Sequence, residues 1–235
     1  FSVVAVPIEA LAATDTNGHW AESAINSWIS SGYISGYPDG TFRPNNAISR
    51  AEFVTIANKA FGFTSSQGIS FNDVKPGYWA YSEIQKGVAA GYIKGDSIGT
   101  FRPGAAVTRQ EAAVMMAQIK KLQTDANAST GYTDYNAIAN WAKPYVGAVS
   151  NAKVMQGFPN GAFRPQTSMT RAEAVSALER ITTAEEHTQQ SESKQQTEEE
   201  SQQKETTQQN ETEQQNETKQ QNETEQQGNM VWKNG

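Results

Sequence analysis

The sequence predicts a mainly α-helical fold of three similar repeats followed by a polar tail. One segment occurs three times: a Trp opens an amphipathic stretch, a Gly-rich turn ends in Phe-Arg-Pro, and Ser/Thr-Arg-x-Glu opens a second helix. Trp20, Trp79 and Trp141 mark the copies and lie 59 and 62 positions apart. Such a period is typical of supersecondary units that bury their apolar faces against one another. We therefore expect one body formed by repeats at 14–70, 71–130 and 131–184.

The first helix of each repeat is predicted to be short and amphipathic, because apolar residues one, five and eight or nine positions after the Trp share one helical face. In the first copy these are Ala21, Ile25, Trp28 and Ile29. Gly32 and Gly91 then predict a left-handed helix end in the first two copies. The third copy has Lys153 at this position, so we expect its helix to end differently.

The turn between the two helices begins at Gly36, Gly95 and Gly157. Pro-Asp-Gly and Pro-Asn-Gly in the first and third copies predict tight turns. The second copy has Ser97-Ile98-Gly99 instead, which predicts a differently shaped turn.

The second helix of each repeat has a complete start signal. A Ser or Thr N-cap is followed three residues later by Glu, which is the pattern of a capping box. The pairs are Ser49 with Glu52, Thr108 with Glu111, and Thr170 with Glu173. Because these helices are apolar over much of their surface, we place them at the centre, with the Trp helices outside.

The capping box explains the Glu of each motif, but it does not explain the Arg. Arg50, Arg109 and Arg171 occupy the first helical position, where the helix dipole disfavours a cation by roughly 0.3–1 kcal/mol. An Arg beside the free N–H groups of a helix N-terminus would suit a carboxylate or phosphate. Ion pairs that lock one repeat to the next are the alternative.

Two further repeated residues are open to a structural and a binding interpretation. The Trp that opens each repeat is either a core anchor or a half-exposed platform for a sugar ring. An Asp precedes each Trp by five to seven residues, and it either caps a loop or binds ligand hydroxyl groups. These acids are Asp15, Asp73 and Asp134.

Composition excludes several kinds of site. The 235 residues include no Cys and two His, which leaves no cysteine zinc site, thiol nucleophile or histidine metal cage. The net charge is −6, but the segment from Glu185 onward carries 12 Glu against 4 Lys, so residues 1–184 are mildly basic at +2. An anionic partner is therefore permitted. We expect no metal, cofactor or nucleic acid.

The two ends of the sequence differ from the repeats. Residues 1–13 are apolar and end in a small-x-small pattern, which predicts the end of an export signal; an apolar N-terminal strand is the alternative. No other apolar run approaches the ~20 residues that span a bilayer. Residues 185–235 are rich in Gln, Glu and Thr and predict a disordered tether to a further domain.

Taken together, these motifs resemble the S-layer homology (SLH) domain family from about Asp15 to Ala184. The resemblance implies three pseudo-threefold repeats around a central three-helix bundle, with grooves between adjacent repeats. It also implies a monomeric module that binds a secondary cell-wall polysaccharide, often one bearing pyruvate ketals, and so attaches exported bacterial proteins to the wall or S-layer surface. The ligand-binding Arg of the family corresponds to Arg50, Arg109 and Arg171.

The leading hypothesis is a wall anchor that binds carbohydrate without turnover. Under this hypothesis the three Arg hold ligand carboxylates and the three Trp border sugar grooves. The turns around Gly36, Gly95 and Gly157 offer backbone donors. The alternative is the wall-anchoring region of a secreted hydrolase whose catalytic domain lies beyond residue 235. Asp15-Thr16-Asn17-Gly18 is a weak calcium-loop signal, because it lacks the distal Glu.

Overall fold

The computed structural model describes residues 13–182. The tail predicted at 185–235 lies outside the described residues, and so does the export signal predicted at 1–13 except for Ala13. Within 13–182 the fold is all-helical, as predicted, with six α-helices and no strands. Five helices are α1 (Glu22–Ser30), α2 (Arg50–Phe61), α3 (Tyr81–Ala89), α4 (Arg109–Ile119) and α5 (Lys143–Asn151). The sixth begins at residue 171 and continues to residue 182. Two 3-10 turns, Asn127–Ser129 and Tyr135–Ala137, precede α5.

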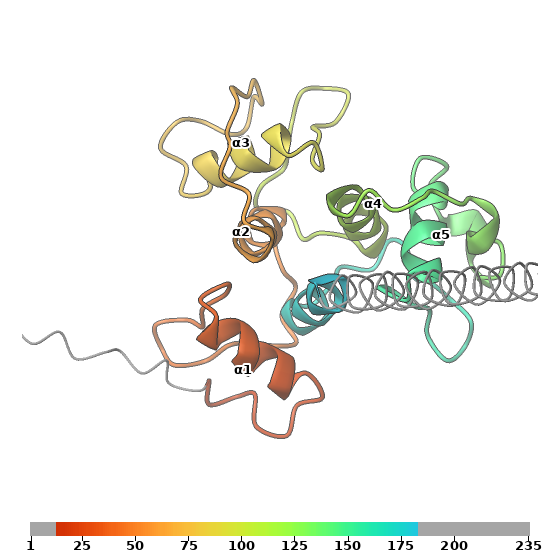
Figure 1. Ribbon diagram of the computed structural model, residues 1–235, viewed down its shortest axis with the longest axis horizontal. Helices are drawn as coiled ribbons and strands as arrows, with labels where there is room; N and C mark the ends of the chain where they lie inside the picture. The colour runs from red at the N-terminus through yellow and green to blue at the C-terminus, as the bar shows by residue number, and fades with distance from the viewer. Residues whose placement is uncertain (1–12, 183–235) are drawn as a thin grey trace, which may run out of the picture. The chain divides into compact units, whose positions relative to one another are not determined.

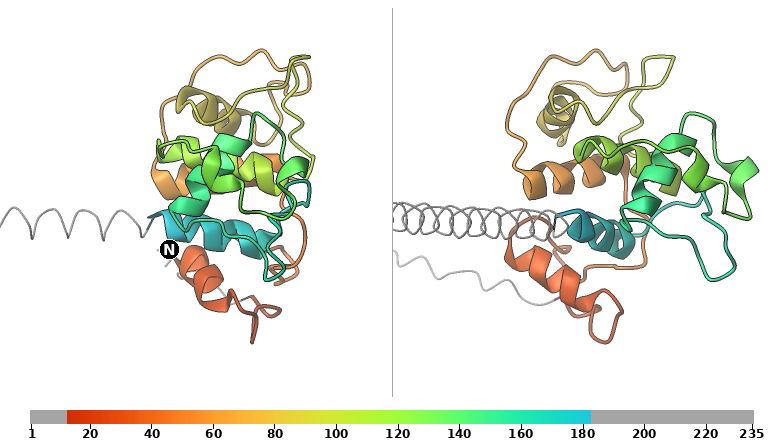
Figure 2. Two further views of the ribbon diagram at one scale, coloured as in Figure 1. Left: turned by 90° about the vertical axis from the view of Figure 1, so that its right-hand side faces the viewer. Right: turned by 45° about the vertical axis from the view of Figure 1, so that its right-hand side comes forward.

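The three longer helices form the centre, as the sequence predicted. Figure 1 shows α2, α4 and the helix at 171–182 side by side and nearly end-on, with α1, α3 and α5 around them. Helix α3 packs on α2, and α5 packs on α4, while α1 lies beside the helix at 171–182 in Figures 1 and 2. Each Trp helix therefore covers the long helix of another repeat, and the arrangement closes on itself with pseudo-threefold symmetry.

A ring of three backbone hydrogen bonds joins the repeats at the start of the long helices. The Ile48 N–H donates to the Met169 carbonyl, Val107 donates to Ile48, and Met169 donates to Val107, at 2.9–3.0 Å. All three side chains are buried. The first and third repeats are thus joined directly, although they are distant in the sequence.

The predicted capping boxes are present in all three repeats. In the first, the Glu52 N–H donates to Ser49 Oγ, and the Ser49 N–H donates to the Glu52 carboxylate. Thr108 with Glu111 and Thr170 with Glu173 form the same reciprocal bonds. These boxes fix where each central helix begins.

The prediction that the third Trp helix ends differently was wrong. Lys153 has φ 57°, close to the 73° of Gly32 and the 80° of Gly91. The Val154 N–H donates to the Val149 carbonyl across this end. A left-handed lysine costs roughly 1–2 kcal/mol, and the burial of the next side chain, Val154, offsets that cost.

The prediction of a differently shaped second turn was also wrong. The Asp96 N–H donates to the Thr100 carbonyl at 2.8 Å, as Tyr37 does to Thr41 at 2.7 Å. The Asp96 carboxylate accepts the N–H groups of Ile98 and Thr100 and so replaces the missing proline as the element that fixes the turn.

Candidate functional site

Arg50, Arg109 and Arg171 connect the repeats in a cycle. Each side chain is nearly buried, with 4–7% of its residue surface exposed. Each Nε donates to the carbonyl of the Phe in the Phe-Arg-Pro turn of another repeat. The acceptors are Phe101, Phe163 and Phe42, at 2.8, 2.8 and 2.9 Å.

Each Arg also faces the capping Glu of that same repeat. The Nη1 atoms lie 3.2 Å from Glu111, 3.7 Å from Glu173 and 3.1 Å from Glu52 for Arg50, Arg109 and Arg171. Burial lowers the pKa of the Arg50 guanidinium, while the charge of Glu111 opposes that shift. Burial of Glu111 opposes its ionisation, but the Thr108 N–H and the Arg50 charge hold the pKa of this carboxyl below its ordinary value.

The helix N-termini beside these arginines are not free, and this part of the anion-site hypothesis was wrong. The Arg50 N–H donates to the Ala105 carbonyl, and the Ala51 N–H donates to the Pro103 carbonyl. The other two helices have the same pair of bonds. The proline of Phe-Arg-Pro in one repeat and the residues after it lie across the helix start of another repeat and accept from its N–H groups. This geometry favours the alternative interpretation, in which each Arg locks two repeats together.

The Trp that opens each repeat is exposed, so the core-anchor interpretation was wrong for this position. Trp20, Trp79 and Trp141 are 63%, 59% and 54% exposed. Trp28, on the apolar stripe of α1, is 3% exposed and belongs to the core. Three large aromatic faces are therefore available on the surface.

Three pockets follow the pseudo-threefold symmetry, and each draws on all three repeats. One repeat contributes the turn and the long helix of a pocket, and we name the pocket after that repeat. Counted cyclically, the preceding repeat contributes the Arg and the following repeat contributes the Trp. The repeat-1 pocket, about 470 Å³, contains Arg171 and Trp79. The repeat-2 pocket, about 540 Å³, contains Arg50 and Trp141. The repeat-3 pocket, about 340 Å³, contains Arg109 and Trp20.

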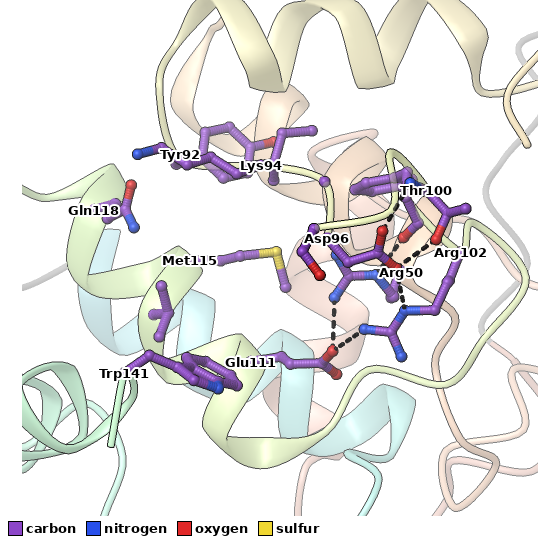
Figure 3. Close-up of a pocket in the computed structure, with 15 residues that line it drawn as sticks. Arg50, Tyr92, Lys94, Asp96, Thr100, Arg102, Glu111, Met115, Gln118 and Trp141 are labelled. Atoms are coloured by element: carbon purple, nitrogen blue, oxygen red, sulfur yellow. Dashed lines mark hydrogen bonds and ion pairs between the residues drawn. The ribbon is translucent and has the colours of Figure 1, made fainter. Parts of the chain in front are cut away.

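Figure 3 shows the repeat-2 pocket, with Trp141 on one side and a network of charges on the other. Glu111 Oε1 accepts from Arg50 at 3.2 Å and from Arg102 at 2.6 Å. Lys94 enters from the turn, and Gln118 projects from α4. The pocket thus places polar and charged groups opposite an exposed aromatic ring.

The glycines that begin the turns are required by close backbone approach. A Cβ at Gly36 would lie 2.7 Å from the Thr41 carbonyl oxygen, and one at Gly157 would lie 2.6 Å from the Tyr132 ring. Gly95 is equally crowded, by Phe71 and Thr100. Gly36 and Gly95 line their pockets. Among the described residues their backbone N–H groups have no acceptor, which leaves these donors available.

The three acids that precede the Trp helices hold the turns together. The Asp15 carboxylate accepts the Phe42 and Arg43 N–H groups, both at 2.7 Å. Asp73 and Asp134 accept the equivalent pairs. In each turn the Arg adopts a left-handed conformation, with φ 57–58°. Because both oxygens of each carboxylate are occupied and none lines a pocket, the geometry favours capping over ligand binding.

Sequence reasoning missed one set of pocket residues. Lys59, Gln118 and Arg180 each follow the capping Glu of their repeat by seven positions and line the corresponding pocket. Residues seven apart lie on one helical face, so the spacing could have placed them beside the Glu. Which pocket they enter depends on the packing between repeats.

Residues 13–182 contain no group of three or more His, Cys, Asp or Glu side chains that could hold a metal ion. None of the helices in this part of the chain is long and apolar enough to cross a bilayer.

Comparison with known proteins identifies the family of this chain. The model of the S-layer homology domain matches residues 14–54, 70–113 and 131–175, more than half of the chain. The chain therefore belongs to the S-layer homology domain family.

Curated relatives that carry similar segments differ in kind. The Surface-layer 125 kDa protein of Lysinibacillus sphaericus is 31% identical over 164 residues, which cover 68% of this chain and 14% of that protein. The Cellulosome-anchoring protein of Acetivibrio thermocellus is 31% identical over 63% of this chain and 35% of its own length. The Amylopullulanase of Thermoanaerobacterium thermosulfurigenes is 28% identical over 70% of this chain and 9% of its own length. The chain thus matches a minor part of each relative.

Proposed function

We propose that this chain anchors an exported bacterial surface protein to the cell wall by binding a secondary cell-wall polysaccharide, without covalent attachment and without turnover. The observation that carries the proposal is the threefold recurrence of one pocket. Each copy combines an exposed Trp, a nearly buried Arg and residues at the start of a Gly-rich turn, contributed by different repeats. Volumes of about 340–540 Å³ are in the range of small-ligand sites.

The roles that we propose follow from the exposure of each group. The Trp faces stack on sugar rings, because they are more than half exposed and border polar groups. The N–H groups of Gly36 and Gly95 donate to sugar oxygens. The arginines hold these turns against the pockets, and their remaining guanidinium N–H groups face ligand oxygens at the pocket base. Three pockets on one module increase the retention of a polymer that reaches more than one of them.

Binding without turnover is favoured by the arrangement of the acids. A glycosidase needs two carboxyl groups that face each other across the scissile bond. The repeat-1 and repeat-3 pockets are each lined by one carboxylate, Glu52 and Glu173, and both cap a helix and face an Arg. The repeat-2 pocket is lined by Glu111 and Asp96; Glu111 has the same capping role, and Asp96 accepts the Ile98 and Thr100 N–H groups that fix the turn. An anchoring segment of a larger enzyme is the second candidate, and similarity to the Amylopullulanase favours it.

Sedimentation with purified, wall-attached polysaccharide tests the proposal. The wild-type chain should be retained, and the variant with Trp20→Ala, Trp79→Ala and Trp141→Ala should be released. Because these side chains are exposed, circular dichroism and the thermal midpoint of the variant should stay close to wild type. Full retention of a folded triple variant would refute the role of the pockets. Release of soluble sugar by the wild-type chain would refute binding without turnover.

A further inference from the structure

We propose that a second cation in each pocket recognises an anionic group on the polysaccharide, and that Lys94 takes over in the repeat-2 pocket the role of Lys59 and Arg180 in the other two. The inference rests on the proposed function and identifies which residues select an acidic glycan. The buried arginines are the obvious candidates, but their charges are already matched.

The charge balance of the pockets points to a cation other than the buried Arg. In every pocket the Arg faces the capping Glu at 3.1–3.7 Å. The repeat-1 and repeat-3 pockets each have one further cation, Lys59 or Arg180. Besides Arg50 and Glu111, the repeat-2 pocket is lined by two cations, Lys94 and Arg102, and one carboxylate, Asp96. Each pocket is therefore lined by one more cationic side chain than carboxylate.

The source of that charge differs between the pockets. At the helix position seven residues after the capping Glu, the repeats carry Lys59, Gln118 and Arg180, so the second repeat lacks a cation there. At the position before the turn glycine they carry Ser35, Lys94 and Gln156, so only the second repeat has a cation there. All six residues line the pockets. In the repeat-2 pocket the cation therefore comes from the residue before the turn glycine, Lys94, and not from the helix position.

No structural role within the described residues accounts for the two lysines. Lys59 and Lys94 are exposed, and neither has a hydrogen-bond or ion-pair partner among residues 13–182. Arg180 donates to the Val154 carbonyl at 3.3 Å, which directs it toward the turn side of the repeat-3 pocket. A charge that is kept in all three pockets but supplied from two different elements is expected if the ligand, rather than the fold, requires it.

The ligand chemistry that fits is a sugar bearing a carboxylate, such as a pyruvate ketal. The sugar ring would stack on the Trp, and the carboxylate would accept charge-assisted hydrogen bonds from the second cation. In the repeat-2 pocket the carboxylate would be bound by Lys94, which lines that pocket (Figure 3).

The test uses two probes that differ by one charge: a methyl hexopyranoside with a 4,6-linked pyruvate ketal, and the methyl ester of its carboxylate. Each pocket has its own Trp, so the indole ¹⁵N–¹H signals of Trp20, Trp79 and Trp141 report the three pockets separately. Trp→Phe variants assign these signals. For wild type we expect all three signals to shift with the acid, and the ester to bind at least about tenfold more weakly, since a hydrogen bond to a charged group is lost.

Variants then assign the cation in each pocket. Lys94→Gln should weaken binding of the acid at least about tenfold at the Trp141 signal alone, and it should leave binding of the ester unchanged. The double variant Lys94→Gln/Gln118→Lys restores the cation from the helix at constant net charge and should recover binding at that signal. Lys59→Gln and Arg180→Gln should act only at Trp79 and Trp20. Lys121→Gln, an exposed lysine outside the three pockets, is the matched control.

The outcomes separate the inference from the proposed function. If wild type binds both probes equally, or if Lys94→Gln weakens acid and ester alike, the inference is wrong. Failure of the double variant to recover binding overturns the exchange of roles between Lys94 and position 118. The proposed function fails instead if the wild-type chain binds neither these probes nor the wall polysaccharide.

Discussion

Arg171→Ala should destabilise the module strongly, because this residue closes the cycle between the third repeat and the first. Its guanidinium donates to the Phe42 carbonyl at 2.9 Å, to the Ser35 carbonyl at 3.0 Å and to Glu52 at 3.1 Å. Hydrogen bonds from a charged group contribute about 1.5–3 kcal/mol each. The Glu52 side chain is 29% exposed, so its pairing with Arg171 adds at most about 1 kcal/mol. The two carbonyl bonds dominate, and the expected loss is about 3–6 kcal/mol.

Urea unfolding followed by circular dichroism measures this loss as a lower midpoint at unchanged slope. In thermal unfolding the midpoint should fall by at least about 6 °C for a body of this size. Arg43→Ala is the control, because Arg43 pairs with Asp39 where both side chains are 42–51% exposed, and we expect a much smaller change in the midpoint than for Arg171→Ala. Arg171→Lys should lie between the two, since lysine keeps the charge but lacks the planar fork that reaches both carbonyls.

Equal midpoints for Arg171→Ala and wild type would refute the assignment of Arg171 as a lock between repeats. The same result would revive the hypothesis that this guanidinium is held ready for a ligand rather than used by the fold.

Three further predictions test the core, the aromatic residues and the acid sensitivity. Gly147→Ala should lower the unfolding free energy by about 1–3 kcal/mol, because the new Cβ would overlap the Asp125 carbonyl; an unchanged thermal midpoint would contradict this packing. Trp28→Ala should cost about 3–5 kcal/mol and Trp20→Ala less than about 1 kcal/mol, since they are 3% and 63% exposed; the opposite order would show that the roles are reversed. The pKa of Glu111 lies below its ordinary value of 4.5 in the folded state, so the stabilisation by its carboxylate is present above pH 4.5 and is lost as the pH falls through the folded pKa. Glu111→Gln should therefore flatten the pH dependence of the urea midpoint between pH 5 and pH 3. Identical pH profiles for the variant and wild type would count against the Arg–Glu pairing.

Local signals in the sequence determined the helices of this protein and the order in which they occur. A capping box depends on residues three apart, and an amphipathic stripe depends on residues within two turns. Ser49 with Glu52 and the stripe from Ala21 to Ile29 therefore predicted their structures correctly. The same local reasoning failed at Lys153 and Asp96, where it treated residue preference as decisive. At Lys153 the burial of the next side chain, Val154, outweighs the preference for glycine. In the second turn the Asp96 carboxylate forms hydrogen bonds that replace the missing proline.

Only the tertiary structure decided which residues meet in a pocket. The sequence repeats Arg, Glu and Trp in every unit, but it does not show that a pocket takes its Arg from the preceding repeat and its Trp from the following one. Nor does it show that the helix N–H groups beside Arg50 are covered by another repeat. These pairings depend on how the three central helices pack, and packing depends on contacts between residues more than a hundred positions apart, such as Ile48 and Met169. Periodicity within one repeat carries no information about such contacts.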